Sequence, residues 1–201
     1  MINRIALLLA CVAAPLSAQS TSTAAPVQAP APQDDLVPVA IDTSLGRIVI
    51  ALDRGRAPIT TANFLRYVDA HRLDGETFYR AMTMGDGGLI QGGVRSDARK
   101  LFPKIVDEPS SKTGLKNVAG AISMAKNAPD SAQADFFILL SDTPYFDEGP
   151  DGFSAFGRVT EGMDVVKKIF ESPTSTTKGE GVMKGQMLEP PVKIIKAARL
   201  K

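Results

Sequence analysis

The sequence predicts a mainly β domain in which short antiparallel strands close into a barrel covered by two helices. Apolar segments too short for ordinary helices recur along the chain, each bounded by glycine-rich or polar turns. Only two stretches place apolar residues at helical spacing, and they lie far apart in the chain. Because many short strands leave exposed edges unless the sheet closes on itself, we expect a closed antiparallel barrel.

The chain begins with a segment typical of export. Residues 1–18 carry one positive residue, Arg4, followed by an apolar run and small residues, which predicts a secretory signal peptide cleaved after Ala18 or Ser20. Cys11 ends a Leu-Leu-Ala-Cys sequence that resembles a bacterial lipoprotein box, so anchoring at Cys11 is the alternative. No later apolar run reaches transmembrane length, and we expect no stable membrane insertion after cleavage.

The composition changes twice after this segment. Residues 19–37 are rich in Pro, Ala, Ser, Thr and Gln, which predicts a disordered linker. Residues 38–201 have the size of one domain with a substantial core. The chain has 23 Lys and Arg against 22 Asp and Glu and no basic block. This balance gives no electrostatic basis for a nucleic-acid partner.

The remaining elements follow in chain order. Residues 39–43 and 47–52 flank a Ser-Leu-Gly turn, which predicts a β-hairpin. An amphipathic helix is expected over residues 57–70, with Pro58 in its first turn. The other expected elements are strands at residues 77–80, 118–124, 134–140, 152–160 and 191–199, a helix at 163–170 and a polar loop at 172–185.

The strand at residues 134–140 carries two different faces. Side chains alternate along a strand, so one face holds Gln133, Asp135, Phe137 and Leu139, and the other holds Phe136, Ile138 and Leu140. A face that begins polar and continues with an aromatic residue could form the floor of a groove with a polar end. Simple core packing of the Phe-Phe-Ile run is the alternative.

Several absences narrow the chemistry. Five glycines lie within residues 85–93, but no phosphate-loop ending or following helix accompanies them, so they indicate turns and close strand contacts. Signal cleavage removes the only cysteine, Gly-x-Ser-x-Gly is absent, and His71 is the only histidine. Acyl transfer and metal hydrolysis are therefore disfavoured, and no metal site is expected. An arginine, apolar strand faces and tight loops suit the binding of an extended peptide.

A family resemblance rests on motifs in a fixed order. They are Phe78-Tyr79-Arg80, Gln-Gly-Gly at residues 91–93, Gly-Ala-Ile-Ser-Met-Ala at 120–125, Phe-Phe-Ile at 136–138, Phe-Gly-Arg-Val at 156–159 and Glu-Gly-Met-Asp-Val-Val at 161–166. From about residue 39 to 199 the chain resembles the cyclophilins, especially the periplasmic cyclophilins of Gram-negative bacteria.

The resemblance implies an eight-stranded antiparallel β-barrel capped by two α-helices. It also implies peptidyl-prolyl cis/trans isomerase activity, without a cofactor, on proline-containing polypeptides. Together with the signal peptide, it predicts a periplasmic enzyme that assists the folding of exported proteins, and we expect a monomer. The alternative is a peptide-binding, chaperone-like module on the same barrel with weak catalysis.

The resemblance also implies the site. Arg80 matches the catalytic arginine, Gln91 a glutamine that lines the site, and Phe137 the proline pocket. The expected substrate-binding set is Phe78, Leu89, Gln91, Ala125, Lys126, Asp135, Phe137, Tyr145, Phe146 and Phe153. The X-Pro bond has a resonance barrier of ~18–20 kcal/mol. A guanidinium aimed at the prolyl nitrogen can stabilise the lone pair that appears as the bond twists, while an apolar pocket holds the ring.

Several positions depart from the family pattern. Three extra residues separate Arg80 from Gln91, and an aromatic position falls near Gly88, which would leave one wall of the proline pocket missing. The substituted site positions are Asp135 for glutamine, Phe153 for histidine or tyrosine, Tyr145 for the tryptophan associated with cyclosporin binding, and Lys126 for a small polar residue.

Asp135 is the departure with the clearest expected consequence. Because it shares a strand face with Phe137, we expect its carboxylate to pair with Arg80 and to divert the guanidinium from the prolyl nitrogen. On this hypothesis Asp135→Gln raises kcat/KM severalfold.

Overall fold

The computed structural model describes residues 35–149 and 151–201. This part of the chain contains eight strands: β1 (Leu36–Thr43), β2 (Gly46–Asp53), β3 (Thr77–Met84), β4 (Gly87–Gly93), β5 (Ala121–Met124), β6 (Phe136–Leu139), β7 (Ala155–Glu161) and β8 (Met187–Arg199). The helices are α1 (Pro58–Asp69), the short α2 (Ser110–Thr113) and α3 (Met163–Phe170). The expected signal peptide and most of the expected linker lie outside the described residues.

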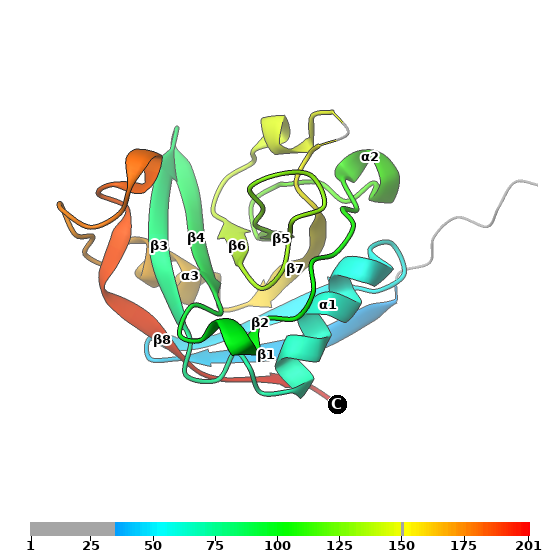
Figure 1. The fold of residues 1–201 in the computed structure, drawn as a ribbon, viewed down its shortest axis with the longest axis horizontal. Helices are drawn as coiled ribbons and strands as arrows, with labels where there is room; N and C mark the ends of the chain where they lie inside the picture. Colours follow the sequence, from blue (N-terminus) through cyan, green and yellow to red (C-terminus); the bar gives the residue numbers. More distant parts are fainter. Residues whose placement is uncertain (1–34, 150) are drawn as a thin grey trace, which may run out of the picture. The chain divides into compact units, whose positions relative to one another are not determined.

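The strands close into a barrel in the order β1-β2-β7-β5-β6-β4-β3-β8, and every neighbouring pair is antiparallel (Figure 1). The predicted fold class is therefore confirmed. Pairing of β1 with β8 completes the ring, so this sheet has no open edge. Among the described residues, no helix is both long and apolar enough to cross a membrane.

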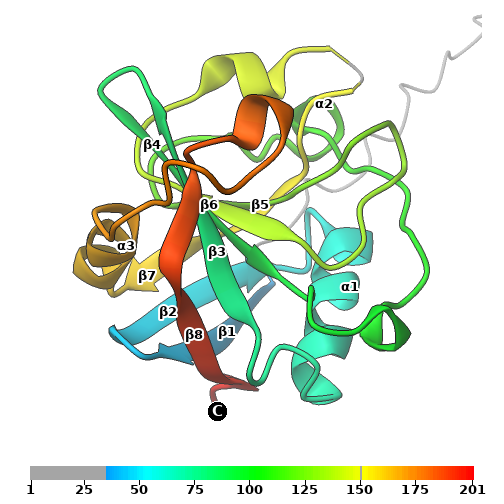
Figure 2. The same ribbon diagram turned by 60° about the vertical axis from the view of Figure 1, so that its left-hand side comes forward.

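The two longer helices lie on opposite sides of the barrel (Figure 2). Both contribute side chains to the apolar core inside it: Phe64, Leu65 and Val68 from α1, and Val165, Val166 and Ile169 from α3. Within this core the rings of Phe64 and Phe136 meet edge to face, with centroids 5.2 Å apart. The helices thus cover apolar surface that the strands alone would leave exposed to water.

The first turn of α1 is capped from a distant part of the chain. Ala57 provides no side-chain cap. Instead, the buried carboxylate of Glu108 accepts hydrogen bonds from the backbone N–H groups of Ile59 (3.2 Å) and Thr60 (2.7 Å). An anion at this end satisfies unpaired N–H groups and interacts favourably with the helix dipole.

Three strands extend well beyond their predicted ends, whereas β5, β6 and β7 begin later than predicted, at residues 121, 136 and 155. β3 continues to Met84 and pairs with Gly87, so β3 and β4 form a long hairpin with a two-residue turn. β8 begins at residue 187, four residues earlier than expected, and β1 begins at residue 36, inside the expected linker. Each of these extensions pairs with a neighbouring strand. Because backbone hydrogen bonds do not depend on side-chain polarity, the strands continue past the apolar residues from which they were predicted.

Candidate active site

A row of paired residues crosses three neighbouring strands on the outside of the barrel. Arg80 on β3 pairs with Gln91 on β4, which pairs with Phe137 on β6. Residues paired directly across antiparallel strands project to the same face. The register therefore brings an arginine, a glutamine and an aromatic ring, far apart in the sequence, onto one surface.

The apolar end of this row belongs to a cluster separate from the barrel core. Its buried members are Leu89, Ala121, Phe137 and Leu139, and its partly buried members are Met82, Met84, Ala125, Phe146 and Phe153. The neighbours of Phe137 on β6, Phe136 and Ile138, lie in the barrel core instead. The two predicted strand faces are thus confirmed, and Phe137 is a buried member of the second apolar cluster and not of the barrel core.

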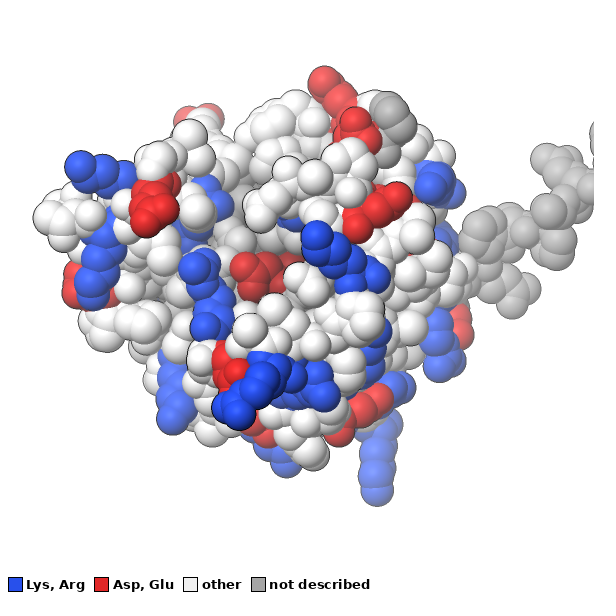
Figure 3. Space-filling view, in the orientation of Figure 1, with Lys and Arg blue, Asp and Glu red and all other residues white. Residues whose placement is uncertain are grey.

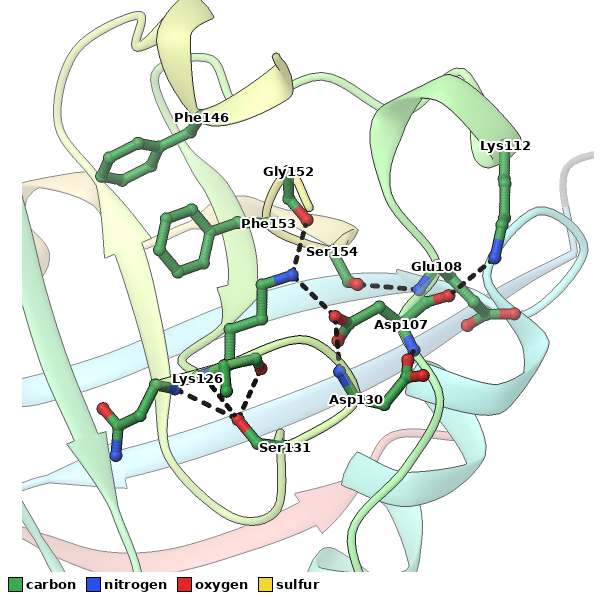
Figure 4. A network of polar contacts seen from close by, with 12 residues as sticks. Asp107, Glu108, Lys112, Lys126, Asp130, Ser131, Phe146, Gly152, Phe153 and Ser154 are labelled. Carbon is green, nitrogen blue, oxygen red and sulfur yellow. Dashed lines mark hydrogen bonds and ion pairs between the residues drawn. The ribbon is translucent and has the colours of Figure 1, made fainter. Parts of the chain in front are cut away.

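Three aromatic rings surround the centre of this cluster. The ring of Phe137 lies 5.6 Å from that of Phe146 and 5.4 Å from that of Phe153, both nearly edge to face. The rings of Phe146 and Phe153 are tilted by 51° to each other, with centroids 4.6 Å apart (Figure 4). This arrangement provides an apolar surface of the kind that a proline ring can contact.

Arg80 is half-buried and held by neutral acceptors. Its Nε donates to Oε1 of Gln186 (2.8 Å), one terminal nitrogen donates to Oε1 of Gln91 (2.8 Å), and the other donates to the sulfur of Met82 (2.8 Å). Within the described part of the chain, no carboxylate makes an ion pair with it. Burial lowers the pKa of Arg80 from its usual value. Among the described residues, two of its five N–H groups have no hydrogen-bond partner, so they are open to a ligand.

A cavity of about 450 Å³ lies beside the row. Its lining includes Tyr79, Gln91, Arg95, Ala125, Asp135 and Met183. Figure 3 shows this face of the molecule hollowed near its centre, with acidic atoms in the hollow and basic side chains on both sides of it. The cavity has room for a side chain of a peptide bound across Gln91.

Asp135 does not pair with Arg80, so that expectation is wrong. Its Oδ2 accepts a hydrogen bond from the Tyr79 hydroxyl at 2.7 Å, and the Arg95 guanidinium lies 4.4 Å from the centre of the Tyr79 ring. The pairing register of β3 shifts between Phe78 and Arg80, so Tyr79 reaches the same cavity and takes the carboxylate. Burial raises the pKa of Asp135, and the Tyr79 hydrogen bond only partly opposes this.

The expected substrate contact of Phe78 is wrong. Phe78 is 0% exposed and packs inside the barrel against Phe136, with ring centroids 5.6 Å apart, so no peptide can reach it. Lys126 is among the residues that line the cavity, but its charge has partners within the protein. The Lys126 ammonium lies 2.6 Å from Oδ2 of Asp107 and 3.1 Å from the carbonyl oxygen of Gly152 (Figure 4).

The family model for "Cyclophilin type peptidyl-prolyl cis-trans isomerase/CLD" matches residues 38–199. The chain belongs to this family. It is a peptidyl-prolyl isomerase of the cyclophilin type, as the sequence predicted.

The relatives are similar over most of their length. Peptidyl-prolyl cis-trans isomerase A of Dickeya dadantii is 36% identical over 140 residues, which cover 68% of this chain and 72% of the relative. A peptidyl-prolyl cis-trans isomerase of Acinetobacter baylyi is 35% identical over 161 residues, which cover 78% of this chain and 82% of the relative.

Solved structures agree with the fold. A crystal structure of a cyclophilin-type isomerase from Cryptosporidium parvum has a TM-score of 0.68 at 20% identity and covers 83% of this chain and 98% of its own. A second crystal structure of that protein, in the presence of the dipeptide Ala-Pro, has a TM-score of 0.66 at 21% identity, covering 82% and 99%.

The β3–β4 hairpin lies where the cyclophilin pattern led us to expect a missing pocket wall. An aromatic side chain cannot occupy position 88, because Gly88 has φ +157° and an added Cβ would lie 2.1 Å from the Met82 carbonyl oxygen. Met82 and Met84 pack against the apolar cluster instead. The Tyr145 hydroxyl contacts the sulfur of Met84 at 3.0 Å. The extra residues between Arg80 and Gln91 thus lengthen a hairpin whose methionines pack against the apolar cluster around Phe137.

Sequence reasoning missed Gln186, which directly contacts Arg80. It comes directly after the segment expected to be a plain polar loop, and 106 positions separate the two residues. The only sequence feature beside Gln186 is the preceding glycine, Gly185. A glycine indicates a turn, but it does not reveal which side chain Gln186 contacts.

Proposed function

We propose that this cyclophilin rotates X-Pro bonds in exported polypeptides, with Arg80 as the catalytic residue and the Phe137 cluster as the proline pocket. One observation carries the assignment of roles. A half-buried guanidinium without a carboxylate partner in the described chain lies in the same strand row as an apolar aromatic cluster. Proline-containing polypeptides are the substrates that this pairing of charge and apolar surface suits.

The chemistry needs no nucleophile. A twisted X-Pro bond loses its resonance, so a lone pair develops on the prolyl nitrogen. The two free N–H groups of Arg80 can stabilise that lone pair more strongly than they stabilise the planar ground state. Neutral partners leave the cation with its full charge, and partial burial weakens the screening of that charge by water.

The proposed site of action is the periplasm. Residues 1–18 have the sequence pattern of a secretory signal peptide, which supports export. Mass measurement of the mature protein tests this: a start at residue 19 or 21 supports it, and retention of residue 1 contradicts it. A diacylglyceryl group on Cys11, lost in Cys11→Ser, would support membrane anchoring of an exported protein instead.

Replacement of Arg80 tests the catalytic role. We expect Arg80→Ala to lower kcat/KM by at least about tenfold, equivalent to ~1.4 kcal/mol of transition-state stabilisation, with nearly the same melting temperature. Exchange of a proline peptide between isomers, followed by NMR, measures the rate. Arg158→Ala is the matched control, because Arg158 is exposed on β7.

Two outcomes would contradict the proposal. Full activity in Arg80→Ala would show that the arginine is not catalytic. A parent protein that binds the peptide but leaves its exchange at the uncatalysed rate, tens of seconds, would favour the chaperone-like binding module.

A further inference from the structure

Gln186 lies where the segment after α3 returns to the barrel, immediately before β8. Its side-chain Oε1 accepts the hydrogen bond from Arg80 Nε at 2.8 Å, and its Nε2 donates to the carbonyl oxygen of Val182 at 2.8 Å. The oxygen end of the amide thus meets a donor and the nitrogen end meets an acceptor, so the flipped amide would lose both hydrogen bonds. The oxygen faces the arginine.

The backbone of Gln186 is fixed as well. Its carbonyl accepts from the N–H of Ala81 (2.9 Å), the neighbour of Arg80, and its own N–H donates to the carbonyl of Met183 (3.1 Å). The surrounding loop is closed by a Lys178–Glu189 ion pair at 2.5 Å. The acceptor is thus anchored both to the strand that carries Arg80 and to the loop that carries Gln186.

We propose that Gln186 is a positioning residue for Arg80, an inference that rests on the proposed catalytic role of that arginine. Gln186 holds Nε while Gln91 holds a terminal nitrogen on another side of the same planar group. Two fixed acceptors on one plane define its orientation, so the two free N–H groups point in a constant direction. Both acceptors are uncharged amides, which orient the cation without neutralising it.

Two substitutions separate orientation from charge. Gln186→Met keeps the approximate size and removes the acceptor, whereas Gln186→Glu keeps an acceptor and adds a negative charge. We expect Gln186→Met to lower kcat about five- to tenfold with little change in KM, because a hydrogen bond to a charged group is lost. Hydrogen exchange of the Arg80 Nε–H, observed by NMR, should become faster in this variant.

The glutamate variant gives the complementary result. We expect Gln186→Glu to protect the Arg80 Nε–H at least as well as the parent does and still to lower kcat, because its carboxylate offsets the cation's charge. Lys184→Met is the control for general disturbance of the loop, since Lys184 is exposed nearby. It should leave kcat and Nε–H exchange unchanged.

The measurements distinguish failure of this inference from failure of the proposed function. If Arg80→Ala lowers kcat but Gln186→Met changes neither kcat nor Nε–H exchange, the positioning role is wrong and the catalytic role stands. If Arg80→Ala has no effect, the catalytic role itself is wrong. In the Arg80→Ala background, Gln186→Met should cause no further loss; an additional loss equal to that in the parent would overturn the proposal. Should Gln186→Met fail to fold, Gln186→Glu with parental kcat would overturn it as well.

Discussion

The ammonium of Lys126 lies 2.6 Å from a carboxylate oxygen of Asp107, and only 7% of each side chain is exposed. This buried ion pair joins the segment after β5 to the segment before α2 (Figure 4). Lys126 also donates to the carbonyl oxygen of Gly152, next to the pocket residue Phe153. Lys126 therefore links Asp107 to the segment that carries Phe153 of the apolar cluster.

Removing the lysine charge should destabilise the protein strongly. Lys126→Met leaves the Asp107 carboxylate buried without its counterion, and we expect a loss of about 3–5 kcal/mol in the free energy of unfolding. The other oxygen of Asp107 is already buried without a hydrogen-bond partner in the described chain, so it offers no compensation. Denaturant unfolding measures the loss.

Two further variants test the cause. The double variant Lys126→Met with Asp107→Leu should recover much of the stability, because no unpaired charge remains. Lys168→Met, which breaks the exposed pair with Asp164, should have little effect. A Lys126→Met protein as stable as the parent would show that the buried pair contributes nothing.

The partly buried carboxylate of Asp135 leads to a prediction about pH dependence. Burial raises its pKa above the unfolded value, so the charged form reduces stability at neutral pH. That cost sets in as pH rises above the unfolded pKa of ~3.9 and is absent below it. Asp135→Asn keeps an oxygen acceptor for the Tyr79 hydroxyl and removes the charge. We therefore expect a higher melting temperature than the parent at pH 7, with the difference vanishing below about pH 4.

Asp69 provides a control of opposite sign. Its hydrogen bond with Arg199 lowers the pKa of Asp69, so its stabilising effect is present at neutral pH and is lost in acid. Asp69→Asn should not raise the melting temperature at pH 7. If Asp135→Asn instead melts below the parent at pH 7, the carboxylate is a net stabilising group and its raised pKa is refuted.

Cyclosporin should bind this cyclophilin poorly. In the family pattern the drug is associated with a tryptophan where this chain has Tyr145, and a phenol lacks the indole N–H donor. The Tyr145 side chain is exposed, and its hydroxyl is already in contact with the sulfur of Met84. Calorimetric titration should give a weak Kd for the parent and a tighter one for Tyr145→Trp. Tight, stoichiometric inhibition of the parent would refute the prediction.

The sequence by itself determined the closed barrel, its two longer helices and the two faces of the strand that carries Phe137. Many short strands that each bury one face must pack into a layered or closed sheet, and closure into a barrel also removes the exposed edges. Alternation along β6 separates Phe137 from Phe136 because the side-chain period of a strand is two. These properties depend on local pattern, so they can be read along the chain.

Only the tertiary structure decided which groups partner the charged side chains. Asp135 and Lys126 were both expected to face the peptide. In the structure the Asp135 carboxylate accepts a hydrogen bond from Tyr79, 56 positions away in the sequence. The Lys126 ammonium pairs with Asp107, 19 positions away. Gln186 reaches Arg80 across 106 positions. A register shift of one residue in β3 redirects Tyr79, and no periodicity in the sequence marks that shift. Hydrogen bonds act over about 3 Å, so the choice of partner depends on where distant segments meet in space.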